Sequence, residues 1–249
     1  MKTARLLIAG AVAVLCAGAA LAAPPMFLVT AVADSSRPAE DVKRDPDRKP
    51  AETLAFAGVK PGASVVDLLP GGGYFTRIMA GAVGAKGHVY ADVPDILASN
   101  PRYVPLIAGL KDFAAAHANT TVTVGDVTKP LAPAPVDIVF TAQNYHDFHN
   151  LPGEGWKAIN KAAYDSLKPG GVYVVLDHVG AAGTGVSQTK TLHRIEPAAI
   201  TSEVEAAGFK LIGTSEVLKD PADDHSKSVF DPAIRGKTDQ IILKFKKVG

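Results

Sequence analysis

The segment from Ser64 to Thr76, SVVDLLPGGGYFT, constrains the fold of this chain more than any other. A short apolar run ends at Asp67, and Pro70 and three glycines then lead into a helical pattern. We expect a buried strand, a glycine turn and the start of a helix, because glycine has no Cβ and adopts positive φ without strain. The free N–H groups of a helix start attract polar or anionic groups. The segment therefore indicates a nucleotide-like cofactor bound to an α/β domain.

Strands and helices are expected to alternate along the rest of the chain, as in a parallel sheet with helices on both faces. The expected strands are residues 65–69, 88–93, 121–125, 136–142, 172–176, 210–218 and 238–245. The expected helices are residues 50–58, 76–83, 104–117, 156–167 and 197–207. Ligands of such sheets bind at the carboxyl ends of the strands. Polar segments would gather at that edge, at residues 69–74, 92–95, 125–127, 143–149 and 177–194.

The start of the chain has the pattern of a Sec-type signal peptide. Lys2 and Arg5 precede an apolar run, and Ala20 to Ala22 offers small residues for cleavage. This predicts a periplasmic or secreted protein with no stable membrane association after removal of the signal, and a retained anchor is the alternative. The expected organisation is a signal peptide, a polar leader and one α/β domain, at residues 1–22, 23–49 and 50–249.

Composition argues against several classes of protein. Of the 249 residues, 47% are hydrophobic and 20% are charged, so the chain is neither disordered nor fibrous. The net charge is +1 and no long basic run is present, so no nucleic-acid partner is expected. The single cysteine, Cys16, lies in the expected signal, so the mature protein would have neither a disulfide nor a cysteine-ligated zinc ion.

Three motifs narrow the choice of cofactor. The turn DLLPGGG lacks the third glycine of a dinucleotide fingerprint, Gly125 and Asp126 end the third strand, and LKPGG precedes the fifth. Together they resemble the class I S-adenosylmethionine-dependent methyltransferases over about residues 50–247. The segments RDPDRKPAE, DLLPGGGYFT, QNYHD and LHRIEP also resemble a group of exported bacterial proteins described only as predicted methyltransferases. The resemblance implies a Rossmann-like fold with a mostly parallel seven-stranded sheet, S-adenosyl-L-methionine as cofactor, and a monomer.

The resemblance also implies where the cofactor binds. The turn glycines would hold its methionine end while Asp67 supports the turn, and Asp126 would meet the adenine. An acid after the second strand would take the ribose hydroxyls. The full set of expected cofactor contacts is Asp67, Gly71, Gly72, Gly73, Tyr74, Asp92, Asp126 and Asn144.

Two departures from the family pattern affect this site. Leu69 and Pro70 stand where a glycine and a variable residue are usual. The ribose acid is displaced from Val93, which leaves Asp92 and Asp95 as alternatives. A shift of one residue on a strand reverses the direction of the side chain, and we favour Asp92.

The segment QNYHD at residues 143–147 follows the fourth strand, a place that in this family adjoins the transferred methyl group. His146 is the candidate general base, because a histidine pKa lies near working pH. Asp147 or Asp177 would orient it. The alternative is a loop held by local hydrogen bonds of its Asn and Asp side chains.

Other polar residues have a less specific interpretation. No metal site is expected, because the spacing of the histidines near this edge fits no compact ligand motif. Asp177 and Arg194 either bind substrate or form a buried ion pair between loops. Arg44, Asp45 and Arg48 either cover the cofactor as a lid, which we favour, or remain solvated.

The predicted function is methyl transfer from S-adenosylmethionine to a small-molecule acceptor. Export is in tension with it, because this cofactor is made in the cytoplasm. The alternative is a non-catalytic exported module that binds an adenosyl-type or other small ligand. A NAD-dependent oxidoreductase is less favoured because the third turn glycine is missing.

Overall fold

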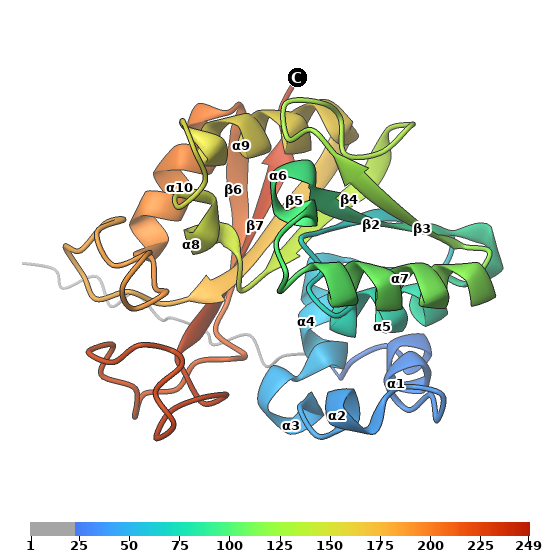
Figure 1. Cartoon of the computed structure of the whole chain (residues 1–249), viewed down its shortest axis with the longest axis horizontal. Helices are drawn as coiled ribbons and strands as arrows, with labels where there is room; N and C mark the ends of the chain where they lie inside the picture. The colour runs from blue at the N-terminus through green and yellow to red at the C-terminus, as the bar shows by residue number, and fades with distance from the viewer. Residues whose placement is uncertain (1–22) are drawn as a thin grey trace, which may run out of the picture.

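A computed structural model describes residues 23–249 of the chain. The expected signal peptide, residues 1–22, lies outside the described residues. Seven strands form one sheet in the order β3-β2-β1-β4-β5-β7-β6 (Figure 1). The strands are β1 Ser64–Leu68, β2 His88–Pro94, β3 Thr120–Gly125, β4 Val136–Ala142, β5 Leu167–His178, β6 Phe209–Ser215 and β7 Gln240–Lys247.

The pairing of the strands confirms the predicted, mostly parallel sheet. β1 pairs in parallel with β2 and β4, and the parallel pairing continues outward to β3 and β5. β7 runs antiparallel between β5 and β6. The carboxyl ends of β1, β2, β4 and β5 therefore meet at one edge, as the alternation of strands and helices indicated.

Helices cover both faces of this sheet (Figure 1). They are α1 Met26–Val32, α2 Ala39–Val42, α3 Asp45–Arg48, α4 Pro50–Ala57, α5 Tyr74–Val83, α6 Asp95–Ala98, α7 Val104–Ala116, α8 Tyr145–Phe148, α9 Gly155–Ser166 and α10 Pro197–Ala206, with a short 3₁₀ helix at Gly84–Lys86. No helix of residues 23–249 is long and apolar enough to span a bilayer.

Side chains of the central strands point alternately to the two faces of the sheet and form a hydrophobic core on each side. Val65 packs in one cluster with Phe75 and Ile78 of α5, whereas Val66 packs in the other with Ile159 of α9. Successive side chains of a strand point to opposite faces, so a buried strand needs apolar residues at consecutive positions. α1, α4 and α5 thus cover one face, and α8, α9 and α10 cover the other.

The leader, residues 23–49, packs onto the domain. Leu28 of α1 is fully buried in the same cluster as α5, with Ala31 beside it. Arg77 of α5 pairs with Asp41 of α2, and its Nε lies 2.9 Å from an oxygen of that carboxylate. Because both charged side chains are largely buried, this pair fixes α2 beside the start of α5.

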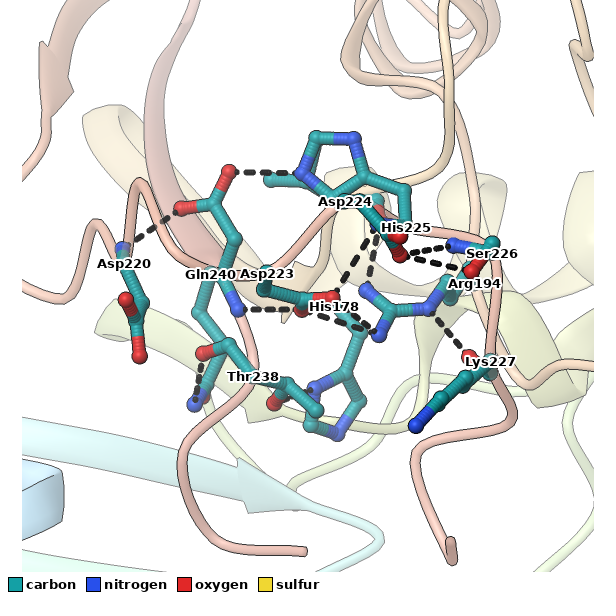
Figure 2. A network of polar contacts seen from close by, with 12 residues as sticks. His178, Arg194, Asp220, Asp223, Asp224, His225, Ser226, Lys227, Thr238 and Gln240 are labelled. Atoms are coloured by element: carbon teal, nitrogen blue, oxygen red, sulfur yellow. Dashed lines mark hydrogen bonds and ion pairs between the residues drawn. The ribbon is translucent and has the colours of Figure 1, made fainter. Parts of the chain in front are cut away.

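The connection between β6 and β7, residues 216–239, contains no helix or strand and is held by a network of polar contacts that includes a buried arginine (Figure 2). Arg194 is fully buried, and its Nη2 donates to Asp223 at 2.9 Å. Its Nε and Nη1 donate to the carbonyl oxygens of Lys227 and Val179, at 2.9 and 3.0 Å. The predicted ion pair between Asp177 and Arg194 is wrong: Arg194 pairs with Asp223, and Asp177 pairs with His146.

Candidate functional site

A cavity of about 690 Å³ lies at the carboxyl edge of the sheet. The turn after β1 and the segment after β4 form two of its walls. The others come from three parts of the chain: the leader, the start of α7, and the connection before β7. Its volume lies within the range of small-molecule and cofactor sites, about 300–1,000 Å³. The cavity is therefore the candidate functional site.

The glycine turn approaches this cavity with its backbone. Gly71, at φ 57°, and Gly72 line it, and a Cβ built on Gly71 would meet open space. Leu69 also has a positive φ, 56°, which is uncommon for a residue with a side chain. Its N–H donates to the carbonyl of Asp92, and its carbonyl accepts from the Asn144 amide, both at 2.8 Å. Leu69 thus keeps the conformation that favours glycine at the position where the family pattern has one.

Asp67 is buried at the end of β1. Its carboxylate accepts a hydrogen bond from the Thr76 hydroxyl of α5 at 2.6 Å, which ties the strand to the helix on either side of the turn. Burial raises the pKa of Asp67 to about 7, and the positive charges of Arg48 and Arg77 only partly offset that effect.

Asp92 and Asp126 lie outside the walls of the cavity. The Asp92 carboxylate is buried and accepts from the Thr123 hydroxyl of the neighbouring strand. Asp126 is exposed and accepts from the backbone N–H and the hydroxyl of Thr128, both at 2.8 Å. Each acid is thus occupied by a local partner, and the ribose and adenine contacts assigned to them remain predictions.

The leader covers the turn through Tyr74. The Tyr74 hydroxyl donates to Asp45 at 2.6 Å, and Arg37 pairs with the same carboxylate at 2.7 Å. The guanidinium groups of Arg44 and Arg48 lie 5.2 and 4.6 Å from the centre of the Tyr74 ring. The three leader residues predicted to form a lid therefore contact an aromatic residue of the turn.

Arg48 connects the leader to the segment after β4. It donates to the side-chain oxygen of Gln143, whose amide in turn donates to Gln240 at the start of β7, at 2.7 Å. Burial lowers the pKa of Arg48 to about 10. A guanidinium group with so little water around it is a strong partner for an anionic ligand group.

His146 and Asp177 form a buried pair at the inner end of the cavity. The Nδ1 of His146 lies 2.8 Å from Asp177, whose other oxygen accepts the backbone N–H of His146 at 2.7 Å. Burial disfavours the imidazolium form, but the negative charge of Asp177 outweighs it and raises the pKa of His146. Asp177 contacts Nδ1 of His146 but not Nε2, and His146 lines the cavity.

Asp147 and His193 lie beside that free nitrogen. Asp147 lines the cavity with a side chain that is 36% exposed, and His193 comes from the loop after β5. His178 also lines the cavity, and burial lowers its pKa to about 3, so this histidine is neutral.

Sequence reasoning missed several walls of the cavity. Tyr103 and Leu106 come from the start of α7, and Phe230 and Gln240 from the connection before β7 and its first residue. None of them belongs to a motif, because they reach the cavity only through the packing of distant segments. The meeting of His193 with His146 was missed for the same reason, although both lie in segments that carried the family resemblance.

No family model and no curated protein matches this sequence. Solved structures do resemble it. A SAM-dependent methyltransferase from Aquifex aeolicus has a TM-score of 0.58 at 20% identity, over 85% of this chain and 99% of that one. The glycopeptide N-methyltransferase MtfA, complexed with S-adenosylmethionine, has a TM-score of 0.53 at 12% identity, over 80% and 87%. The [4+2]-cyclase SpnF has a TM-score of 0.59 at 16% identity, over 82% of both chains. At these identities the likeness establishes the fold, the Rossmann-like fold of class I methyltransferases.

Proposed function

We propose that this protein binds S-adenosylmethionine in the cavity at the carboxyl edge of the sheet and transfers its methyl group to a small-molecule acceptor. One observation carries the proposal: the glycine turn between β1 and α5 opens onto a cavity that is also lined by His146, whose ring is held by the buried Asp177. The proposed setting is the periplasm or the outside of the cell, with the protein a monomer and with neither nucleic acid nor membrane as partner.

The residues around the turn fit the methionine end of the cofactor. Its carboxylate would meet Arg44 or Arg48, which line the cavity beside Tyr74. Its ammonium group would meet Asp67 and carbonyl oxygens of the turn. The volume of about 690 Å³ leaves room for a small acceptor beside the cofactor.

The adenosine end needs a rearrangement of two side chains, neither of which lines the cavity. Asp92 would exchange the Thr123 hydroxyl for the ribose hydroxyls, and Asp126 would extend from the surface to the adenine. Tyr103 and Leu106 line the cavity and offer an apolar wall for the base. This half of the site is the part of the proposal that a binding measurement tests most directly.

His146 is proposed to act on the acceptor. When bound, the cofactor supplies an electrophilic methyl group on a sulfonium ion. Asp177 accepts the Nδ1 proton of His146 and so orients the ring and leaves Nε2 to take a proton from an acceptor hydroxyl, thiol or amine. Asp147 lies 3.5 Å from Nε2 and would stabilise the charge that develops there. The buried pair thus positions a proton acceptor, and alignment of the acceptor does the rest.

A non-catalytic binding module is the second candidate. The tension between export and a cofactor made in the cytoplasm favours keeping it, and the likeness to a cyclase shows that methyl transfer does not follow from this fold alone. The two candidates share the ligand and differ in turnover.

Calorimetric titration with S-adenosylmethionine, S-adenosylhomocysteine and NAD tests the proposal. We expect micromolar binding of the first two and none of NAD. The variant Gly72→Val should lose binding, because Gly72 lines the cavity. The matched control Gly109→Val should bind normally, because Gly109 lies on α7 with no atom near its Cβ position. A folded protein that binds neither adenosyl compound would contradict the proposal.

Turnover is then measured as formation of S-adenosylhomocysteine with a panel of small acceptors. The variant His146→Gln should keep cofactor affinity and lose most of this activity, by about 10²–10⁴-fold for a general base. Binding without turnover for any acceptor would favour the binding module.

A further inference from the structure

Three side-chain atoms that commonly ligate metals converge at the wall of the cavity. Nε2 of His146 lies 3.3 Å from Nδ1 of His193 and 3.5 Å from Oδ1 of Asp147. Nδ1 of His193 lies 3.4 Å from that same oxygen. The three atoms thus form a nearly equilateral triangle of two imidazole nitrogens and one carboxylate oxygen. We propose that His146, Asp147 and His193 bind a divalent first-row transition metal ion, with zinc the best match.

The size of the triangle carries this inference. A zinc ion lies about 2.0–2.1 Å from its nitrogen and oxygen ligands, so two ligands of a tetrahedral site stand about 3.4 Å apart. All three separations agree with that value, whereas octahedral ligands would stand about 3.0 Å apart. The three ligand atoms thus already stand at the separations that the ion requires.

Hydrogen bonds alone account poorly for the same contacts. In the neutral form of His146, with its Nδ1 proton directed to Asp177, Nε2 is an acceptor, as is the Asp147 carboxylate. A single proton on Nδ1 of His193 would have to serve both at 3.3 and 3.4 Å, and hydrogen bonds from nitrogen are usually about 2.9–3.0 Å long. A cation in the centre satisfies all three lone pairs at once.

The surroundings hold the ligand atoms in place. Asp177 fixes His146 through Nδ1 and accepts two backbone N–H groups, from His146 and His178, each at 2.7 Å. A carboxylate behind a ligating histidine is the usual arrangement in metal sites, because it sets the tautomer and the direction of the ring. The side chain of His146 is 3% exposed, so its free nitrogen faces the cluster rather than bulk water.

His193 contacts the cluster from an unusual backbone conformation. Its φ is 55°, in the left-handed region that a residue with a side chain seldom adopts. The ring packs edge-on against Phe230 at 4.7 Å and against His146 at 5.3 Å. Backbone strain of this kind persists where the surrounding structure imposes it, and it concentrates at functional sites.

Two histidines and one carboxylate leave a fourth position open toward the cavity, where both His146 and Asp147 are wall residues. A catalytic role for the ion rests on the proposed function. In that role, an acceptor hydroxyl or thiol occupies the open position. The ion lowers the pKa of this group, which therefore loses its proton to solvent. A lone pair of the resulting anion forms the bond to the methyl carbon, and the electrons of the broken carbon–sulfur bond return to the cofactor's sulfur. With the ion bound His146 acts as a ligand, and its role as a base applies to the protein without the ion.

Metal binding is tested on the whole protein, free of any histidine tag, after treatment with a chelator. We expect one equivalent of Co²⁺ to give the intense visible bands of four-coordinate cobalt, and Zn²⁺ to remove them. The variants His193→Gln and Asp147→Asn should lower the zinc affinity at least about tenfold, and Asp177→Asn by about 10–100-fold as a positioning residue. Asp147 is one-third exposed, so its variant keeps the assay interpretable if His193→Gln folds poorly.

The matched control is His88→Gln. His88 is a half-buried histidine at the start of β2, on the edge of the sheet opposite the cavity, and it is hydrogen-bonded to Thr121. Its replacement should leave the cobalt spectrum unchanged. Absence of the bands in the unmodified protein would overturn the proposal, as would bands that persist in both ligand variants. Because these measurements omit the cofactor, their outcome is independent of whether S-adenosylmethionine binds. A need for zinc in turnover would then support the catalytic role, and full turnover in chelator would refute that role.

Discussion

At the scale of single residues, the site is organised by carboxylates that are withdrawn from water. Asp67 and Asp177 are both almost fully buried, yet their environments act in opposite directions. Burial raises the pKa of Asp67 to about 7, whereas Asp177, also penalised by burial, is kept ionised by His146, which lowers its pKa. One acid therefore changes charge near neutral pH while the other remains an anion that orients its histidine.

The raised pKa of Asp67 predicts a dependence of stability on pH. The unfolded chain releases this proton near pH 3.8 and the folded protein near pH 7, so the free energy of unfolding falls as pH rises between these values and is flat above them. The variant Asp67→Asn has no such carboxyl group, so its free energy of unfolding should not show this fall. Between pH 4 and pH 8, its free energy of unfolding should rise by up to about 4 kcal/mol relative to that of the unmodified protein.

Urea denaturation of both proteins across this pH range measures the gain. The control Asp112→Asn, on the exposed face of α7, should show none. A difference between Asp67→Asn and the unmodified protein that does not vary with pH would refute the raised pKa.

The positions of some site residues could be predicted from the sequence, and those of others could not. Asp67 and the glycines follow from one contiguous motif, and the structure puts them around the turn. The direction of Asp92 did not follow, because it depends on whether Thr123 of the neighbouring strand offers a hydroxyl to it. The contact of His193 with His146 required the course of a loop with an unusual backbone, which no periodicity encodes.

At the scale of elements, buried ion pairs help to fix the leader and the connection before β7. Arg37 pairs with Asp45 of α3, and Arg194 pairs with Asp223 in the connection. The side chain of each arginine is at most 2% exposed. The loss of its partner would therefore leave an unpaired charge in the interior. The regular strands and long helices could be predicted within a few residues from periodicity and glycine signals, except that β5 begins at Leu167 instead of the predicted Val172. These irregular elements could not, because distant partners set their course.

The pair of Arg37 with Asp45 predicts unequal costs for two substitutions at the same junction. Asp45→Ala leaves the Arg37 charge buried and unpaired and should lower the free energy of unfolding by about 3–5 kcal/mol. Tyr74→Phe removes only the hydrogen bond to Asp45 and should cost about 1 kcal/mol. Chemical denaturation of both variants compares them.

The control for this comparison is Glu40→Ala. It breaks a pair with Lys43 in which both side chains are at least 70% exposed, and it should have almost no effect. Equal costs for Asp45→Ala and Tyr74→Phe would show that Arg37 finds another partner or reaches water.

At the scale of the whole molecule, the cavity is closed by parts from both ends of the described chain. Arg48 of the leader, Gln143 after β4 and Gln240 of β7 are joined in one line of hydrogen bonds across it. A ligand bound in the cavity would contact all of these segments. Such a ligand stabilises the folded protein because it binds the folded state alone.

The proposed cofactor site therefore predicts a stability that rises with adenosyl ligand. At a concentration 100 times its dissociation constant, S-adenosylhomocysteine should raise the free energy of unfolding by about 2.7 kcal/mol. Denaturation at several ligand concentrations measures this, and the same concentrations of NAD serve as the control. Gly72→Val should unfold independently of the ligand, and a ligand effect that survives this substitution would place the binding elsewhere.

The position of β7 has a consequence for how the protein is made. β6 reaches the rest of the sheet only through β7, which is the later of the two strands in the chain and lies between β5 and β6. A ribosome therefore releases β6 before the strand that will hold it exists, and Gln240, at the cavity, emerges later still. The nascent chain can assemble β1 to β5 first, but β6, β7 and the last wall of the cavity can take their places only after β7 has been synthesised. Premature termination would thus give a chain with an open sheet edge and no closed cavity, a species that quality-control proteases can distinguish from the finished protein.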